Sequence, residues 1–365
     1  MGKLFQKALL TMALVFAMGA GIFGSVVFDA APAYAQSGGN VPGGSLGASS
    51  DAEMWRAVRK GITGSVSIPD KKAGVLVQAE GDMLRAFRQG PFSTYSVYAL
   101  GGMVVVLILF FLLRGKIRIE AGPSGQTIER FNSLERATHW LTASSFIVLA
   151  LTGLNLMYGK FVLMPIIGKP AFAAISEYAK LGHNYVGFAF MVGIVLMFVL
   201  WVRHNIPNKY DLMWLAKGGG LFSKGVHPPS PRFNAGQKLV FWTTILGGFT
   251  LSMSGLMLIF PFEYAVWAKT FSVINVLGFN LPTEMTPLME TQLSLVWHGV
   301  VGVIMITLII AHIYIGSIGM EGAIHAVGSG QVDVNWAKEH HNMWVAEMEG
   351  RDPEEVIRHG HQPAE

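Results

Sequence analysis

Residues 293–320, LSLVWHGVVGVIMITLIIAHIYIGSIGM, contain no charged residue and are long enough to cross a membrane as one helix. His298 and His312 lie fourteen positions apart in this stretch. At about 100° per residue their side chains point within about 40° of each other, and at about 1.5 Å rise per residue they are roughly 21 Å apart along the axis. Ionisable residues are costly inside a bilayer and are therefore candidates for a functional site. This helix is expected to present two imidazoles on one face, at two depths.

Four more uncharged stretches of membrane length precede this one. They cover approximately residues 95–113, 138–159, 181–202 and 239–260. The composition is 52% hydrophobic and only 14% charged, which is typical of an integral membrane protein and not of a large soluble core. The sequence therefore predicts an all-α integral membrane protein with five transmembrane helices.

Two further histidines, His139 and His183, stand at the edges of the second and third stretches. Each of the four histidines has a small residue at i+4: Ala143 after His139, Gly187 after His183, Gly302 after His298 and Gly316 after His312. Positions i and i+4 share one helix face, so a flat haem can lie against the helix beside each imidazole. The pattern predicts bis-histidine haem ligation. The alternative is histidines that hydrogen-bond between helices, with glycines that serve only close packing.

The lysines and arginines predict the orientation of the spans. Eleven lie in the loops on one side, namely Arg114, Lys116, Arg118, Arg130, Arg136, Arg203, Lys209, Lys217, Lys224, Arg232 and Lys238. The two loops on the other side carry four, namely Lys160, Lys169, Lys180 and Lys269. Because positive charge concentrates in cytoplasmic loops, the first span is expected to run inward and the C-terminal tail to be cytoplasmic. The net charge of +4 thus reflects topology and not nucleic-acid binding.

The N-terminus has the order of a secretory signal peptide. Lys3 and Lys7 precede an apolar run at 8–28, and Ala33-Tyr34-Ala35 follows, so residues 1–35 are predicted to be cleaved after Ala35. The run is long for a signal peptide, which leaves an uncleaved anchor as the alternative. Residues 36–92 are then a periplasmic segment, and 93–125 hold an extra transmembrane helix with a cytoplasmic linker. Residues 126–365 hold the remaining four spans and the tail.

Depth in the membrane predicts how the histidines pair. His183 and His298 both lie towards the outer side, and His139 and His312 towards the inner side. We therefore expect an outer haem between the first two and an inner haem between the last two. His204 is the rival ligand for the inner haem, although its place after an arginine at the water interface favours a snorkelling role.

Three arginines are candidates to bind the propionates of the inner haem: Arg130, Arg136 and Arg203. The alternative is that they are ordinary cytoplasmic loop charges.

The absence of cysteine predicts the type of haem. The chain has no cysteine, which excludes a thiolate-bound iron–sulfur cluster, covalent c-type haem and any disulfide in this chain. The two haems are therefore expected to be non-covalent haem b.

An ordered set of short motifs resembles a known family. The motifs are ERF (129–131), RATHW (136–140), GH (182–183), RHNIP (203–207), NAGQK (234–238), WHG (297–299), HIY (312–314) and WAKEHH (336–341). Together they resemble the gamma subunits of respiratory formate dehydrogenase, the cytochrome b556 membrane subunits, over roughly residues 126–350. This chain departs from the shorter family form by the additional N-terminal part, which puts the lateral contacts of the bundle in doubt.

The resemblance implies a four-helix dihaem cytochrome b domain, here with one extra N-terminal helix, in the bacterial inner membrane. Its implied partners are an iron–sulfur beta subunit and a molybdenum or tungsten alpha subunit that oxidises formate in the periplasm. Electrons would pass from the outer to the inner haem and then to ubiquinone or menaquinone, with protons taken from the cytoplasm. A higher oligomer of the complex is compatible with the resemblance.

The resemblance also carries residue roles. It implies that His139, His183, His298 and His312 are haem ligands and that quinone binds near His312 and Asn234, with Gln237 nearby. Asn234 also precedes a predicted helix, where asparagine is a favoured N-cap. The tail pair His340-His341 is expected to be a solvated interfacial pair, with proton delivery as the alternative.

Two other kinds of function are considered: a different dihaem cytochrome b subunit, and a membrane protein without haem. The cytochrome b subunit of a nickel–iron hydrogenase or of thiosulfate reductase shares the dihaem plan. A transporter or a passive anchor is disfavoured because the spans lack acidic residues and an evident inverted repeat.

Overall fold

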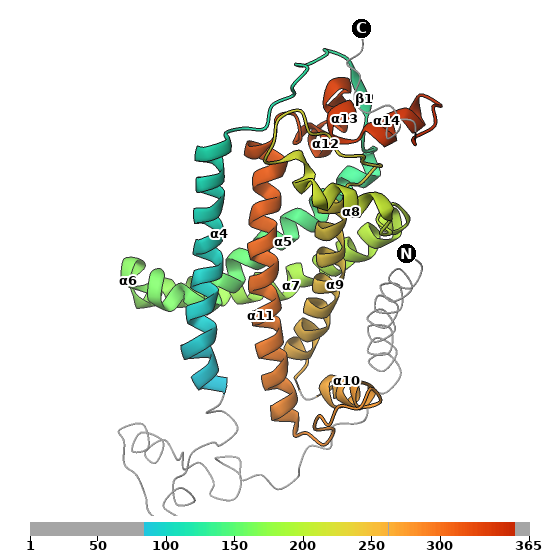
Figure 1. Cartoon of the computed structure of the whole chain (residues 1–365). Helices are drawn as coiled ribbons and strands as arrows, with labels where there is room; N and C mark the ends of the chain where they lie inside the picture. The colour runs from blue at the N-terminus through green and yellow to red at the C-terminus, as the bar shows by residue number, and fades with distance from the viewer. Residues whose placement is uncertain (1–83, 262, 355–365) are drawn as a thin grey trace, which may run out of the picture. The chain divides into compact units, whose positions relative to one another are not determined.

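A computed structural model shows residues 84–261 and 263–354 of the chain (Figure 1). The predicted signal peptide and most of the segment 36–92 lie outside these residues. The described residues contain five helices that are long and apolar enough to cross a membrane, at Leu84–Arg114, Ser133–Val162, Lys169–His204, Ala235–Ile259 and Pro287–Gly319. The chain is therefore a multi-pass helical membrane protein, and all five predicted spans are confirmed.

Each span has one long α-helix. These helices are α4 (Ser93–Arg114), α5 (Ser133–Val162), α7 (Lys169–Trp201), α9 (Ala235–Ile259) and α11 (Pro287–Tyr314). The short helices are η1 (Arg88–Phe92), α6 (Met164–Ile167), η2 (Val202–His204), α8 (Lys209–Ala216), η3 (Gly218–Gly220), α10 (Val266–Asn275), η4 (Ile315–Gly319), α12 (His325–Gly328), α13 (Val334–His340) and α14 (Asn342–Met348). Two strands, β1 (Thr127–Glu129) and β2 (Gln331–Asp333), pair antiparallel with Ile128 opposite Val332.

Side-chain caps begin some of these helices before the apolar run starts. At α5, the Asn132 side chain accepts a hydrogen bond from the Glu135 amide at 3.0 Å, and the Glu135 carboxylate accepts one from the Asn132 amide at 3.0 Å. This reciprocal capping box satisfies amides that have no partner within the helix. It explains why α5 begins five residues before the uncharged stretch predicted from 138.

The chain divides into two compact units. One contains residues 260–296 and the described residues up to Ser93, and the other contains Thr94–Ile259 and Trp297 onward. In the first unit, the Glu290 carboxylate accepts hydrogen bonds from the Trp267 and Ala268 amides, at 2.8 and 2.7 Å. A carboxylate in this position stabilises the N-terminus of α10.

Close helix packing in the second unit depends on three glycines. An added Cβ at Gly193 of α7 would lie 2.5 Å from Oγ1 of Thr142 on α5. An added Cβ at Gly248 of α9 would lie 2.7 Å from Ile194 on α7, and one at Gly247 would lie 2.6 Å from Met305 on α11. Small residues of this kind let membrane helices approach closely, and α5 and α7 run side by side (Figure 1).

One end of the second unit is covered by the chain segments outside the spans, and we call it the capped end (Figure 1). It comprises β1, β2, α8, α12, α13, α14 and the loops 115–132 and 221–234. The Glu339 carboxylate accepts hydrogen bonds from the amides of Glu120 and Ala121, at 3.0 and 2.9 Å. Trp140 at the start of α5 donates to the Val327 carbonyl at 2.8 Å. The tail is therefore bound to the bundle and to the linker after α4.

The extra helix α4 contacts α11 through aromatic rings. Phe110 packs edge-on against Tyr314, with ring centroids 6.2 Å apart, and against Phe222 at 5.8 Å. The linker after α4 bonds to the end of α11, because the Ile117 amide donates to the Gly319 carbonyl at 2.8 Å. The extra helix thus occupies part of the α11 surface.

Candidate functional site: two histidine pairs

The four predicted ligands form two pairs of facing rings. His183 on α7 lies opposite His298 on α11, with ring centroids 6.1 Å apart. His139 on α5 lies opposite His312 on α11, with ring centroids 6.4 Å apart. Helix α11 therefore contributes one ring to each pair, and the second pair lies near the capped end, where α5 begins and α11 finishes.

Both ring separations fit a metal ion held between two imidazoles. With a metal–nitrogen bond of about 2 Å, each ring centre lies about 3 Å from the metal, so two rings on opposite sides are about 6 Å apart. The separations of 6.1 and 6.4 Å match this expectation for both pairs.

The first pair is oriented by hydroxyl groups from neighbouring helices. Nδ1 of His183 lies 2.8 Å from Oγ1 of Thr152 on α5, and Nδ1 of His298 lies 3.0 Å from Oγ of Ser254 on α9. Each hydroxyl donates its own hydrogen to a carbonyl of its own helix, at 2.7 Å for Thr152 and 2.9 Å for Ser254. The hydroxyl oxygens therefore accept from Nδ1–H. This tautomer leaves Nε2 of both rings free to bind a metal.

A glycine follows each of these hydroxyl residues and lies against the ring at van der Waals distance. A Cβ added at Gly153 would lie 3.4 Å from Cε1 of His183, and one added at Gly255 would lie 3.4 Å from Cε1 of His298. The sequence analysis did not identify these two hydroxyl residues or the glycines that follow them, namely Thr152, Gly153, Ser254 and Gly255. The signal was present as a repeat, Thr-Gly-Leu at 152–154 and Ser-Gly-Leu at 254–256, on two different helices.

The small residues found from the sequence face open space. A Cβ added at Gly187, Gly302 or Gly316 would meet no atom within 4 Å. Since Gly193, Gly247 and Gly248 are closely packed, open space is not a general property of the glycines in these helices. The open glycines lie one turn from a paired histidine, where a flat cofactor needs room.

The second pair lacks such a polar shell around His139. Nδ1 of His139 is buried and has no hydrogen-bond partner among the described residues. His312 is exposed at the surface of the second unit. The rival His204 lies in η2 with its ring 6.5 Å from Phe233. The structure thus brings His139 and His312 together and places His204 against an aromatic ring of the capped end.

Residues 130–329 match the family described as prokaryotic cytochrome b561. This match covers more than half of the 365 residues and includes all four paired histidines. The chain belongs to this family. Membership of a cytochrome b family implies haem b as the cofactor.

Curated relatives place this cytochrome b within a narrower group. It is 30% identical over 223 residues to the formate dehydrogenase cytochrome b556(fdo) subunit of Escherichia coli K12, which is 61% of this chain and 93% of the relative. It is 28% identical over 236 residues to the nitrate-inducible formate dehydrogenase cytochrome b556(Fdn) subunit of the same strain, 64% of this chain and 97% of the relative. A formate dehydrogenase cytochrome b556 subunit of Haemophilus influenzae is 28% identical over 224 residues, 60% of this chain and 83% of the relative. The resemblance to this family is confirmed.

The capped end of this cytochrome b encloses Arg130. Its side chain is only 2% exposed, and its guanidinium lies over the rings of Phe233 and Trp344, at 5.5 and 4.7 Å. It donates to the Arg232 carbonyl and faces Nε2 of His341 at 3.3 Å. Burial, and then the charge of Arg232, lower the pKa of Arg130 to about 9. A side chain enclosed in this way is not free to contact a propionate, so the structure does not support that role for Arg130.

The other two propionate candidates have different surroundings. Arg136 donates to the Gly328 carbonyl at 2.7 Å, which ties α5 to α12, while its Nε is buried without a partner among the described residues. Arg203 is exposed, and its Nε lies 3.5 Å from Nε2 of His204. Of these two arginines, Arg136 is the better candidate to bind a haem propionate, since it lies one turn before His139 on α5.

The expectation of a solvated histidine pair in the tail is wrong. His341 is 1% exposed, and its Nε2 must accept from Arg130, because a guanidinium has only donors. Its Nδ1–H then donates to the Pro231 carbonyl at 3.1 Å. Nε2 of His340 is buried without a partner among the described residues. The cause is long-range packing of the tail onto the loop before α9, which the tail sequence alone does not reveal.

This buried pair predicts loss of stability in acid. Burial lowers the pKa of His340 to about 4 and the pKa of His341 well below 6.5. Because the folded state holds both rings neutral, their contribution is complete above the unfolded pKa of about 6.5 and is lost as the pH falls below it. Between pH 6.5 and 5, about 2 kcal/mol should be lost at His340.

Thermal unfolding in detergent at several pH values measures this effect. The loss of stability from pH 7 to 5 should be smaller in His340→Gln than in the unmodified chain. The matched control is His325→Gln in α12 of the same end, which should keep the full pH dependence. An equal pH dependence in all three proteins would contradict the prediction.

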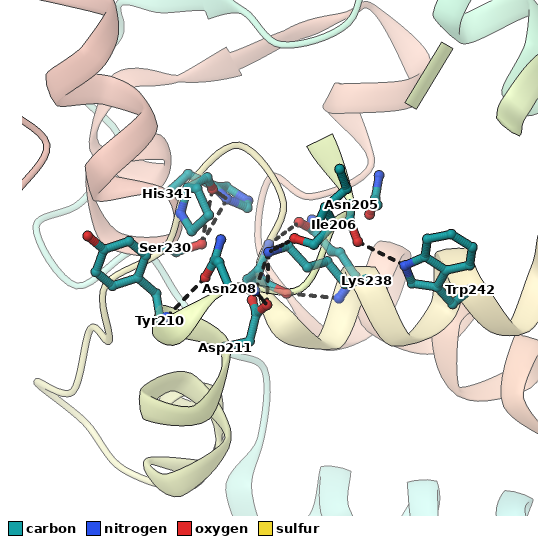
Figure 2. A network of polar contacts seen from close by, with 12 residues as sticks. Asn205, Ile206, Asn208, Tyr210, Asp211, Ser230, Lys238, Trp242 and His341 are labelled. Carbon is teal, nitrogen blue, oxygen red and sulfur yellow. Dashed lines mark hydrogen bonds and ion pairs between the residues drawn. The ribbon is translucent and has the colours of Figure 1, made fainter. Parts of the chain in front are cut away.

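The predicted quinone residues form a helix cap. The Asn234 side chain accepts from the Gln237 amide at 2.9 Å, and the Gln237 side chain accepts from the Asn234 amide at 3.1 Å. This is the capping box of α9, so the N-cap role expected for Asn234 is confirmed. One turn later, the buried Lys238 ammonium lies 2.9 Å from the Asp211 carboxylate and 3.1 Å from the Ile206 carbonyl (Figure 2).

The polar network around Lys238 holds the loop after α7 against α9. Trp242 donates to the Asn205 carbonyl at 2.8 Å (Figure 2). The Asn205 side chain donates to the Trp201 carbonyl at 2.9 Å. Asn205 is fully buried, yet its Oδ1 has no partner among the described residues. This network fixes the start of α9 and with it the position of Asn234.

Proposed function

We propose that this cytochrome b is the dihaem membrane subunit of a respiratory formate dehydrogenase. One haem b would bind between His183 and His298, and the other between His139 and His312. The observation that carries this proposal is the presence of two facing imidazole pairs, with ring centroids 6.1 and 6.4 Å apart, on one shared helix. The formate dehydrogenase subunits among the relatives support the choice of enzyme.

The residues of the chain hold and separate the two sites. The histidines supply Nε2 to the metal, Thr152 and Ser254 fix two of the rings, and the open glycines admit the cofactor plane. Bound haem supplies reversible one-electron transfer. Because His298 and His312 are roughly 21 Å apart along α11, the two sites lie at different depths of the membrane.

The orientation we propose places the capped end in the cytoplasm of a bacterium, beneath the inner membrane. The cationic residues support it, since Arg130 and Arg232 lie in the loops of this end. Arg114 and Arg136, at the ends of α4 and α5, bond to carbonyls of its loops and of α12. The electron donor is then a periplasmic iron–sulfur subunit, which serves a molybdenum or tungsten subunit that oxidises formate. Moving an electron towards the cytoplasm is opposed by the membrane potential. For an electron that crosses the whole membrane, the free-energy cost is about 2.3 kcal/mol per 100 mV.

The acceptor we propose is a membrane quinone at the start of α9. Asn234 and Gln237 are half-buried and lie at the capped end, where His312 is exposed. Reduction of a quinone to quinol takes two electrons and two protons. A site at this end would take the protons from the cytoplasm.

Haem content tests the proposal directly. The purified full chain should contain two b haems per polypeptide, because it has two imidazole pairs of the correct separation. The pyridine-haemochrome absorbance divided by the protein concentration gives this number. A value near one would contradict the pairing, and a value of zero would contradict the function.

Asn234→Ala tests the quinone site in the complete complex. We expect slow quinol formation while formate still reduces both haems, because the path between the haems is not altered. Removal of the cap should cost about 1 kcal/mol of stability. Haem reduction and quinone turnover are measured on the same preparation.

Asn208→Ala is the matched control, since Asn208 forms the capping box of α8 with Asp211 at the same end. It should lose similar stability and keep normal quinone turnover. Normal turnover in Asn234→Ala would place the quinone elsewhere. Failure of formate to reduce the haems would show that Asn234 serves the fold.

A further inference from the structure

The two imidazole pairs differ in what their Nδ1 atoms contact. At the His183–His298 pair, both Nδ1 atoms face a hydroxyl, at 2.8 and 3.0 Å. At the other pair, Nδ1 of His139 is buried with no partner among the described residues. The Nδ1 atoms of His183 and His298 therefore each have a hydrogen-bond acceptor, whereas Nδ1 of His139 has none among the described residues.

This difference affects the metal that each pair would hold. An imidazole that donates Nδ1–H to an acceptor gains electron density and becomes a stronger ligand through Nε2. A stronger donor stabilises the oxidised form of iron more than the reduced form, and hydrogen bonds to the ligands are one of the means by which a protein sets a haem potential. More acceptors at one pair therefore mean a lower reduction potential at that pair.

We propose that the Thr152 and Ser254 hydroxyls hold the reduction potential of the haem at His183–His298 below that of the haem at His139–His312. This inference rests on the proposed function, because it assumes haem at both pairs. An electron that leaves the first iron and reduces the second then moves to the higher potential. The internal transfer towards the capped end is downhill, which helps to offset the membrane potential that opposes it.

The arrangement of the two hydroxyls is built for this contact. They belong to different helices, α5 and α9, and each is followed by a glycine, where an added Cβ would lie 3.4 Å from Cε1 of the ring, in ordinary van der Waals contact. Ser252, on the same helix as Ser254, donates to the Gly248 carbonyl at 2.7 Å. Ser252 thus bonds to the backbone of its own helix, which makes it a matched control for Ser254.

The test is redox potentiometry of the full chain with its haems, followed by visible absorbance. The unmodified chain should show two components, and the lower one should be the component that His298→Ala removes. Thr152→Val and Ser254→Ala should each raise the lower midpoint and leave the upper one unchanged. The double variant should raise it by about the sum, since the hydroxyls act on opposite rings.

Two further variants separate a tuning role from a structural one. Thr152→Ser keeps a hydroxyl and should restore the original midpoint, and Ser252→Ala should not move it. An unmoved lower midpoint in the double variant, or a lower component that survives in His298→Ala, would overturn the inference. Two haems with unmoved midpoints would overturn this inference alone, whereas a chain with one haem or none would overturn the proposed function together with it.

Discussion

Gly302→Leu is expected to abolish haem binding at the His183–His298 pair and to leave one haem per chain. A Cβ at this position meets no atom within 4 Å, so the substitution does not clash with the protein at that atom. Leucine also has a better helix propensity than glycine, by roughly 1 kcal/mol. The side chain would instead fill the space beside His298 that the haem plane needs. Haem content should fall from two to one, as measured by pyridine haemochrome, with unchanged helix content.

Gly102→Leu on α4 is the matched control. This glycine is also in a membrane helix and has no atom within 4 Å of an added Cβ, but no paired histidine lies on its helix. It should retain both haems. If Gly302→Leu also retained both haems with normal spectra, the small residue beside His298 would not be part of a haem site.

Lys238→Met should cause a large loss of stability, because it breaks a buried ion pair at the start of α9. The Lys238 and Asp211 side chains are 5% and 12% exposed, and their charged atoms lie 2.9 Å apart. Removal of one partner leaves the other charge buried without compensation, which typically costs about 3–5 kcal/mol. The start of α9 should loosen as well, because the ammonium also binds the Ile206 carbonyl. Thermal unfolding of the chain in detergent measures the loss.

Two comparisons make this test specific. Lys238→Met combined with Asp211→Leu should recover most of the stability, because no buried charge remains unpaired. Lys209→Met removes an exposed pair with Glu354, whose side chains are 64% and 46% exposed, and should cost far less stability because water screens the two charges. Equal losses from Lys238→Met and Lys209→Met would mean that the Lys238–Asp211 pair is not buried in the folded protein.

The transmembrane helices and the spacing of His298 and His312 were determined by the sequence itself. Their signals are local: uncharged runs of bilayer length predict spans, and a fixed rise per residue places two histidines on one face. Helix ends were less accurate, since α7 begins at Lys169 and not near 181. The hydrophobic run marks the hydrocarbon region, whereas a helix continues beyond it until its backbone finds another partner.

Only the tertiary structure decided which groups surround the histidines. Thr152 and Ser254 contact His183 and His298 across 31 and 44 positions of sequence, from helices that meet only after the bundle packs. His341 and Arg130 are 211 positions apart, and their contact turns an apparently solvated tail into a buried part of the capped end. Local periodicity shows which face a residue occupies, but the neighbour on that face comes from another helix. The candidate ligands could therefore be read from the sequence, whereas the hydrogen bonds that orient them depend on the fold.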